Sequence, residues 1–168
     1  DTIISQDPSF FILYFAGHGI NTPEGGYICT IDCEPYEEGV SFEFISKTIN
    51  RLSDTTKVCI ILDCCRSGGI NIALHQKGSI NIDNETIRNE LGSLGRGKIV
   101  LAACEHDDTA KELEDFRHGF FTYHLINGLF GYAANASGEV TVSKLFEYIS
   151  TKMEAAGLQT PVLRGDQI

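Results

Sequence analysis

The chain has 168 residues, enough for a single domain with a hydrophobic core. Hydrophobic residues make up 42% of the chain, charged residues make up 21%, and no apolar run reaches the roughly 18 residues that a membrane-spanning helix needs. The formal net charge of −10 argues against nucleic acids and anionic membranes as partners, because both require a basic surface. It is compatible with a basic peptide substrate, or with an acidic surface that only keeps the protein in solution.

The first part of the chain predicts a βαβ unit. A buried strand is expected at Phe10–Ala16, followed by a helix over Phe42–Leu52 that Ser41 caps and whose apolar residues recur at helical spacing. This helix returns the chain to a second buried strand at Val58–Leu62, which is then parallel to the first. The glycine-rich stretch between the first strand and the helix is expected to contain a loop and one short strand, at residues 20–26 and Tyr27–Ile31.

The second part begins with a long, glycine-rich connection at residues 66–98. Five features are expected in or after it: a short helix at Glu85–Leu94, a third buried strand at Ile99–Cys104, a helix at His118–Phe130, a last helix capped by Thr141 and closed by Gly157, and a final strand at Gln159–Leu163. We expect one domain made of residues 1–65, the connection at 66–98 and residues 99–168.

Both buried strands of the first part end in chemically reactive residues. The first leads into Gly17-His18-Gly19, and the second leads into Asp63-Cys64-Cys65. Ligands of open α/β sheets bind at the carboxyl ends of such strands. Cys65 follows His18 by 47 positions (65 − 18), and the fold can bring a thiol and a histidine at such a distance together as nucleophile and base. We therefore predict that Cys65 and His18 form a catalytic dyad, whereas Cys64 points away from Cys65 and is structural.

The six cysteines indicate a reducing compartment, and we expect the protein in the cytoplasm. Cys59 and Cys104 lie in apolar runs, where a free cysteine behaves as a small hydrophobic residue. Neither a Cys-x-x-Cys pair nor a His-x-x-x-His pair is present, so the sequence predicts no metal site. A disulfide framework is not expected either, because the chain is large enough to form a hydrophobic core without one. A further hypothesis is a thiol redox or metal-binding domain built on Cys64, Cys65 and Cys104.

Two motifs together resemble those of a known family. Tyr14-Phe-Ala-Gly-His18-Gly19 and Asp63-Cys-Cys65-Arg-Ser-Gly68 resemble the histidine and cysteine motifs of the caspase-like cysteine peptidases, closest to the metacaspase branch. That branch has Asp-Ser-Cys-His-Ser-Gly, so Cys64 replaces its serine and Arg66 its histidine. Further stretches resemble the small-subunit region of the family: Leu101–Cys104, Gly119–Thr122, Gly138–Val142 and Gln159–Pro161.

The resemblance implies a caspase-like (caspase-hemoglobinase) α/β fold, a three-layer sandwich around a mostly parallel sheet. It also implies peptide-bond hydrolysis, in which the backbone N–H groups of Cys65 and Gly19 stabilise the oxyanion. Caspases that cleave after aspartate have glutamine where this chain has Asp63. A carboxylate at this position favours Arg or Lys before the scissile bond. His106 occupies the position of a second specificity acid, which makes Asp107 and Asp108 further candidates for substrate binding.

Metacaspase-like domains begin with a strand, a helix and another strand ahead of the histidine strand, whereas this chain starts just before that strand. We therefore expect one of two situations: the sequence covers only part of such a domain, or the domain is a reduced member of the family whose sheet lacks these first strands and has an exposed edge. A flanking domain or a partner chain is the expected partner of that edge. Calcium is a possible cofactor by analogy with metacaspases, although the sequence has no recognisable calcium loop. The alternative to a peptidase is a catalytically silent caspase-like scaffold. If the protein is a peptidase, Lys77 in the long connection is the expected site of self-cleavage.

Overall fold

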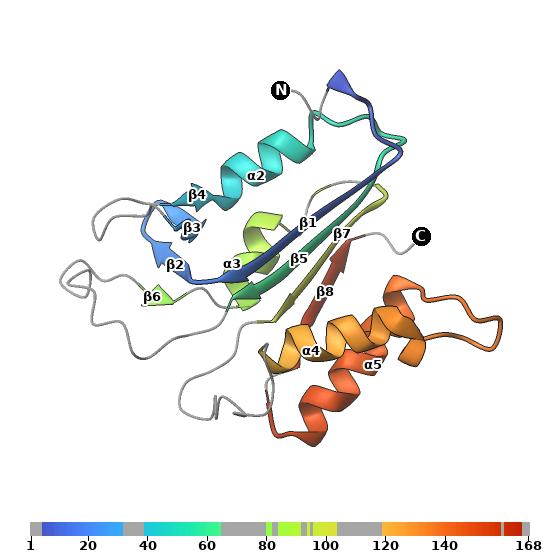
Figure 1. Ribbon diagram of the computed structural model, residues 1–168. Coiled ribbons are helices and arrows are strands. Elements are labelled where there is room, and N and C mark those ends of the chain that lie inside the picture. Colours follow the sequence, from blue (N-terminus) through green and yellow to red (C-terminus); the bar gives the residue numbers. More distant parts are fainter. Residues whose placement is uncertain are drawn as a thin grey trace.

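The computed structural model describes residues 5–31, 39–64, 80–81, 84–91, 94, 96–103, 119–158 and 160–165. Its central element is sheet A, which has the strand order β1-β5-β7-β8 (Figure 1). The four strands are β1 (Phe10–Gly17), β5 (Lys57–Cys64), β7 (Lys98–Ala103) and β8 (Val162–Gly165). The first three strands are mutually parallel and β8 is antiparallel to β7, so the three predicted buried strands are confirmed as neighbours in a mostly parallel sheet.

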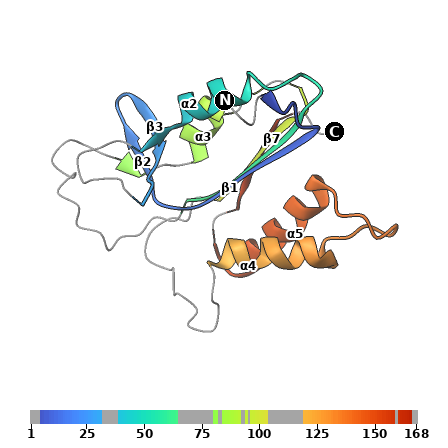
Figure 2. The same ribbon diagram turned by 45° about the horizontal axis from the view of Figure 1, so that its top comes forward.

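Helices cover both faces of sheet A and create two hydrophobic cores. Figure 2 shows α2 (Phe42–Ile49) and α3 (Asn84–Leu91) on one side of the sheet, and α4 (Phe120–Asn127) and α5 (Val142–Ala155) on the other. Side chains of β5 alternate between these cores, because successive residues of a strand point to opposite faces. Ile60 and Leu62 pack with α2 and α3, whereas Cys59 and Ile61 pack with α4 and α5. The predicted α/β three-layer arrangement is confirmed.

A second, antiparallel sheet, sheet B, has the order β4-β3-β2-β6. Its strands are β2 (Gly19–Thr22), β3 (Gly25–Ile28), β4 (Val40–Ser41) and β6 (Ile80–Asn81). The prediction of a loop over residues 20–26 was wrong, because β2 and β3 form a tight hairpin there. The predicted strand at Tyr27–Ile31 likewise starts and ends earlier. A Cβ on Gly26 would lie 2.8 Å from Cδ2 of the buried Phe42, so the missing side chain lets the hairpin pack directly on α2.

The predicted helix caps are present. The Ser41 side chain accepts a hydrogen bond of 3.1 Å from the N–H of Phe44 at the start of α2, and the Thr141 side chain accepts one from the N–H of Lys144 at the start of α5. Gly157, just beyond the end of α5, has the positive φ of 72° typical of a helix-terminating glycine. The α2 helix ends at Ile49, three residues earlier than predicted.

Three other predicted elements differ at their ends. In place of the predicted helix at residues 118–130, α4 ends at Asn127 and continues as the π-helical turn η2 (Gly128–Tyr132), in which Gly131 has a φ of 112°. The short helix predicted at residues 85–94 is α3, which ends at Leu91. The last strand begins at Val162, directly after Pro161, which lacks the N–H that a strand residue can donate.

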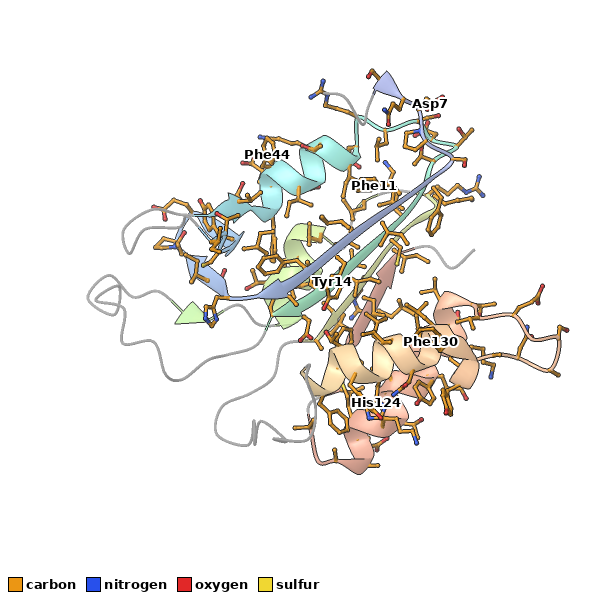
Figure 3. All side chains as sticks on the ribbon, viewed as in Figure 1. Asp7, Phe11, Tyr14, Phe44, His124 and Phe130 are labelled. Atoms are coloured by element: carbon orange, nitrogen blue, oxygen red, sulfur yellow. The ribbon has the colours of Figure 1, made fainter. Side chains whose placement is uncertain are left out.

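The outer edge of sheet A is formed by β1, and within the described residues its only strand partner is β5. Phe11, Leu13 and Phe15 pack against the core on the α2 and α3 side. Phe10 and Ile12, on the opposite face, are each 55% exposed, and Tyr14 lies on the side of α4 (Figure 3). The expected exposed edge is therefore present in the described part of the sheet.

Candidate active site

The pairing of β1 with β5 brings the histidine motif next to the cysteine motif. In the parallel register between them, Ala16 pairs with Asp63 and Gly17 pairs with Cys64. His18 and Cys65 are the next residues along the two strands, and adjacent strands lie about 4.8 Å apart. Cys65 itself lies outside the described residues. The sheet therefore directs the two motifs to neighbouring points on its carboxyl edge.

His18 connects the last residue of β1 to the first residue of β2 and is half-buried. Its carbonyl oxygen accepts a hydrogen bond of 2.8 Å from the N–H of Cys29, which joins this turn to sheet B. In an antiparallel ladder, hydrogen-bonded and non-hydrogen-bonded pairs alternate. The next pair, Gly19 with Ile28, is consequently a non-hydrogen-bonded pair, and the N–H of Gly19 points away from β3.

Cys64 and Asp63 end β5 and point to opposite faces of sheet A. Cys64 is only 2% exposed and belongs to the core under α2 and α3. Its place in that core fits the structural role predicted from alternation along the strand. Asp63 is 3% exposed and lies on the α4 side, where its Oδ2 accepts a hydrogen bond of 2.5 Å from the hydroxyl of Thr122.

The neighbourhood of Asp63 is made of small residues and hydroxyl groups. Its partners on the two adjacent strands are Ala16 and Ala103, and Gly119 precedes α4 with space for a Cβ 3.5 Å from Asp63 Oδ2. The Thr122 hydroxyl oxygen also lies 2.7 Å from the Tyr14 hydroxyl oxygen. Sequence reasoning missed Tyr14 and Thr122 as site residues, because they are 108 positions apart and neither is the catalytic residue of its motif. The signals that the sequence offered were the place of Tyr14 in the histidine motif and the place of Thr122 in the Gly119–Thr122 stretch, which resembles the small-subunit region of the family.

The remaining predicted site residues lie outside the described residues. These are Cys65, Asp107, Asp108 and Lys77, and the same holds for Cys104. Of the thiols that the structure describes, Cys59 is buried beneath α4 and α5, and this burial raises the pKa of its thiol. A raised pKa keeps a thiol protonated and unreactive, in agreement with the expectation that Cys59 acts as a small hydrophobic residue.

His124 is a further histidine on α4, away from the carboxyl edge of sheet A (Figure 3). Its ring contacts those of Phe120, Tyr123 and Tyr148, with centroid distances of 4.5, 5.1 and 6.0 Å. Burial, and then the charge of Lys152, lower the pKa of His124. His124 is therefore a packed aromatic residue of the helical layer.

Comparison with known families identifies the fold. A model of the caspase domain family, peptidase family C14, matches residues 4–167. The chain belongs to the caspase domain family. A search of curated proteins found no significant match. The fold described above is thus that of a cysteine peptidase domain. Its histidine and cysteine motifs lie at the carboxyl ends of the paired strands β1 and β5.

No helix in the described part of this caspase domain is both long and apolar enough to cross a membrane. The described residues likewise contain no group of three or more His, Cys, Asp or Glu side chains that is arranged to hold a metal ion.

Proposed function

We propose that this caspase domain is a cysteine endopeptidase that cleaves peptide bonds after Arg or Lys, with Cys65 as nucleophile and His18 as base. The observation that carries the proposal is the pairing of Gly17 with Cys64, after which His18 and Cys65 leave adjacent parallel strands. The proposal favours the metacaspase branch of the family, because the motif Asp63-Cys64-Cys65 provides an acid two residues before the nucleophile.

In this mechanism the Cys65 thiolate attacks the carbonyl carbon of the scissile bond, and the carbonyl oxygen becomes an oxyanion. The backbone N–H groups of Cys65 and Gly19 bind this oxyanion. The Gly19 N–H faces away from β3, on the side of β2 where β6 pairs, and its part in the proposal rests on the family resemblance. His18 then protonates the leaving amine as the carbon–nitrogen bond breaks. Water, deprotonated by His18, hydrolyses the thioester and regenerates Cys65.

Asp63 provides the preference for a basic residue. It lies on the face of sheet A opposite to Cys64, at the strand end that leads into the nucleophile. Water is largely excluded there, since Asp63 is 3% exposed, and a carboxylate in such a place favours a guanidinium or ammonium group over an acidic side chain. Asp107 and Asp108, which follow β7 in sequence, are proposed as additional acids of the same pocket.

The proposal is tested by incubating the protein with a peptide library and identifying the new termini by mass spectrometry. Cleavage after Arg and Lys is expected, with negligible cleavage after Asp. Asp63→Asn removes the charge while nearly preserving the shape, so it should lose most activity on basic substrates. A library cleaved after Asp, or left uncut by a folded and reduced protein, would contradict the proposal.

A second candidate function is a non-catalytic interaction module, and the exposed strand β1 is the observation that favours it. An edge strand presents unpaired backbone groups that can bind another strand. β1 also has no charged residue, and its Phe10 and Ile12 are exposed. A flanking segment or partner chain at this edge is compatible with either function, so activity and not binding separates the two candidates.

We also propose a reducing compartment, such as the cytoplasm, for this domain. None of the described cysteines, Cys29, Cys59 and Cys64, forms a disulfide bond, and two of them are buried in the hydrophobic cores. Disulfide bonds are rare in such compartments, and free thiols persist there. Calcium, which the family resemblance suggests, is best treated as a variable in the activity assays.

A further inference from the structure

A chain of hydroxyl groups connects the strand of the histidine to the acid next to the nucleophile. It runs from Tyr14 on β1, through Thr122 on α4, to Asp63 on β5. The oxygen–oxygen distances are 2.7 Å for the first link and 2.5 Å for the second. Three elements that are far apart in sequence thus meet at one buried carboxylate.

The direction of the hydrogen bonds follows from the number of protons. An ionised carboxylate only accepts, so the Thr122 hydroxyl donates its single proton to Asp63 Oδ2. The Thr122 oxygen then accepts from the Tyr14 hydroxyl, which donates its own proton. Each of the two hydrogen bonds therefore has its own proton, and the bond from Tyr14 orients the hydroxyl of Thr122.

The residues paired with Asp63 on sheet A have small side chains. Its neighbours on β1 and β7 are Ala16 and Ala103, each of which carries only a methyl group. Thr122 is itself only 8% exposed and belongs to a helix that is packed on the sheet. A hydrogen bond from a fixed, buried donor is therefore well placed to set the orientation of the carboxylate.

We propose that Thr122 is the positioning residue for Asp63, and that its hydroxyl, oriented by Tyr14, holds the carboxylate in the orientation that binds the basic residue of the substrate. This inference rests on the proposed function, since it concerns substrate recognition by Asp63. The Thr122 bond uses one of about four lone-pair positions of the carboxylate. Thr122 does not touch the substrate, and its effect on specificity acts through Asp63.

Two substitutions at this position separate the hydroxyl from the packing. Thr122→Val keeps the branched shape and removes the hydroxyl, whereas Thr122→Ser keeps the hydroxyl and removes a methyl group. Thr151→Val is the matched control, because it removes the hydroxyl of an exposed residue of α5 that bonds only to the Glu147 carbonyl within its own helix. Tyr14→Phe removes the first link, between Tyr14 and Thr122, and should have a smaller effect in the same direction.

The measurement compares kcat and KM for a peptide with arginine before the scissile bond with those for the same peptide containing citrulline, its uncharged analogue. Thr122→Val is expected to lower kcat/KM for the arginyl peptide by about tenfold to a hundredfold, mainly by raising KM, as the loss of a hydrogen bond to a charged group would. The preference for arginine over citrulline should fall, while Thr122→Ser and Thr151→Val keep it. The rate of Cys65 alkylation by iodoacetamide should not change, which shows that the nucleophile remains intact.

The contrary outcomes are distinct. If the original protein prefers arginine and Thr122→Val retains that preference, the inference is overturned. It is also overturned if Thr122→Ser loses as much of the preference as Thr122→Val, because Thr122 then contributes packing and not its hydroxyl. In both cases the proposed function still stands. If the original protein cleaves neither peptide, or shows no preference for arginine, the proposed function fails and the inference fails with it.

Discussion

Gly17 of β1 is paired with Cys64 of β5 in the parallel ladder of sheet A, one residue before His18 and Cys65 on their respective strands. This register directs two motifs separated by 47 positions (65 − 18) to neighbouring points of the sheet, as the proposed dyad requires. A shift of the register by one residue would exchange the faces to which Asp63 and Cys64 point. Alternate packing of β5 against both helical layers prevents such a shift, because Cys64 and Asp63 have very different environments.

The first prediction concerns the two neighbouring thiols. Cys65→Ala and His18→Ala should each abolish hydrolysis of an arginyl peptide, whereas Cys64→Ala should retain most of it. Cys64 is buried in the core under α2, so its replacement should instead lower thermal stability. Initial rates and melting temperatures of the three variants check this. An inactive Cys64→Ala together with an active Cys65→Ala would show that the nucleophile has been assigned one residue too late.

The second prediction is self-cleavage after Lys77. A protease must draw several residues around the bond into an extended form, and Arg96 is poorly placed for this. The carbonyl of Gly97, directly after Arg96, accepts a hydrogen bond of 3.0 Å from the N–H of Val58 in sheet A. Intact-mass measurements, with and without calcium, should therefore detect a fragment ending at Lys77.

Three variants control this measurement. Lys77→Gln should suppress the fragment, Arg96→Gln should leave it unchanged, and Cys65→Ala should prevent it altogether. A fully active protein that stays uncut would contradict the prediction.

The third prediction concerns the packing of sheet B on α2. Gly26→Ala would place a Cβ 2.8 Å from Phe42 Cδ2 and 3.0 Å from Thr86 Cγ2. Phe42 is fully buried and has little freedom to move, so the substitution should lower the free energy of unfolding by about 1–3 kcal/mol. Urea denaturation of Gly26→Ala, Phe42→Leu and the double variant measures the coupling. The double variant should lose less stability than the sum of the single variants, and strictly additive losses would show that the predicted clash does not occur.

Several elements could be predicted from sequence because the local residue pattern and the burial of the element in the fold favour the same structure. The runs at residues 10–16, 58–62 and 99–104 are apolar enough to be strands of a covered parallel sheet, and Ser41 and Thr141 are good caps. The strand β2 could not be predicted in this way. Its sequence, Gly-Ile-Asn-Thr, has no strong strand preference, and it is stabilised by pairing with β3 on one side and with β6, about 60 residues later, on the other.

The site shows the same division. His18, Asp63 and Cys65 follow apolar runs that predict buried strands, and functional residues of α/β sheets are expected at the carboxyl ends of such strands. Thr122 is a helix residue, and its hydrogen-bond partners are far away in the sequence: Asp63 is 59 positions away and Tyr14 is 108 positions away. Only tertiary structure brings it to Asp63. The close packing of α4 on α5 also depends on tertiary structure, because an added Cβ on Gly128 would lie 2.5 Å from Leu145 Cδ1.

The fourth prediction concerns pH. Burial and the Lys152 charge lower the pKa of His124 in the folded protein, and its Nδ1 has no hydrogen-bond partner among the described residues. As the pH falls through about 6.5, the unfolded chain therefore binds a proton at this histidine before the folded protein does. The stability that neutral His124 contributes is fully present above this range and is lost as the pH decreases.

His124→Phe should consequently reduce the difference between the unfolding free energies at pH 7.5 and pH 5.5, as measured by urea denaturation. Lys152→Met should reduce it less, because burial is the larger cause of the lowered pKa. A His124→Phe protein with the same pH dependence as the original protein would show that this residue is not responsible.

The most direct test of the proposed peptidase is covalent labelling with a peptide that carries arginine and a fluoromethyl ketone, followed by peptide mapping. The reagent alkylates a nucleophilic thiol only after its arginine side chain has been bound, so it reports on Cys65 and on the basic-residue pocket together. We predict modification of Cys65 alone among the six cysteines, with strong reduction in Asp63→Asn and in His18→Ala. A folded protein in which no cysteine is labelled, or in which Cys64 is labelled in place of Cys65, would contradict the account.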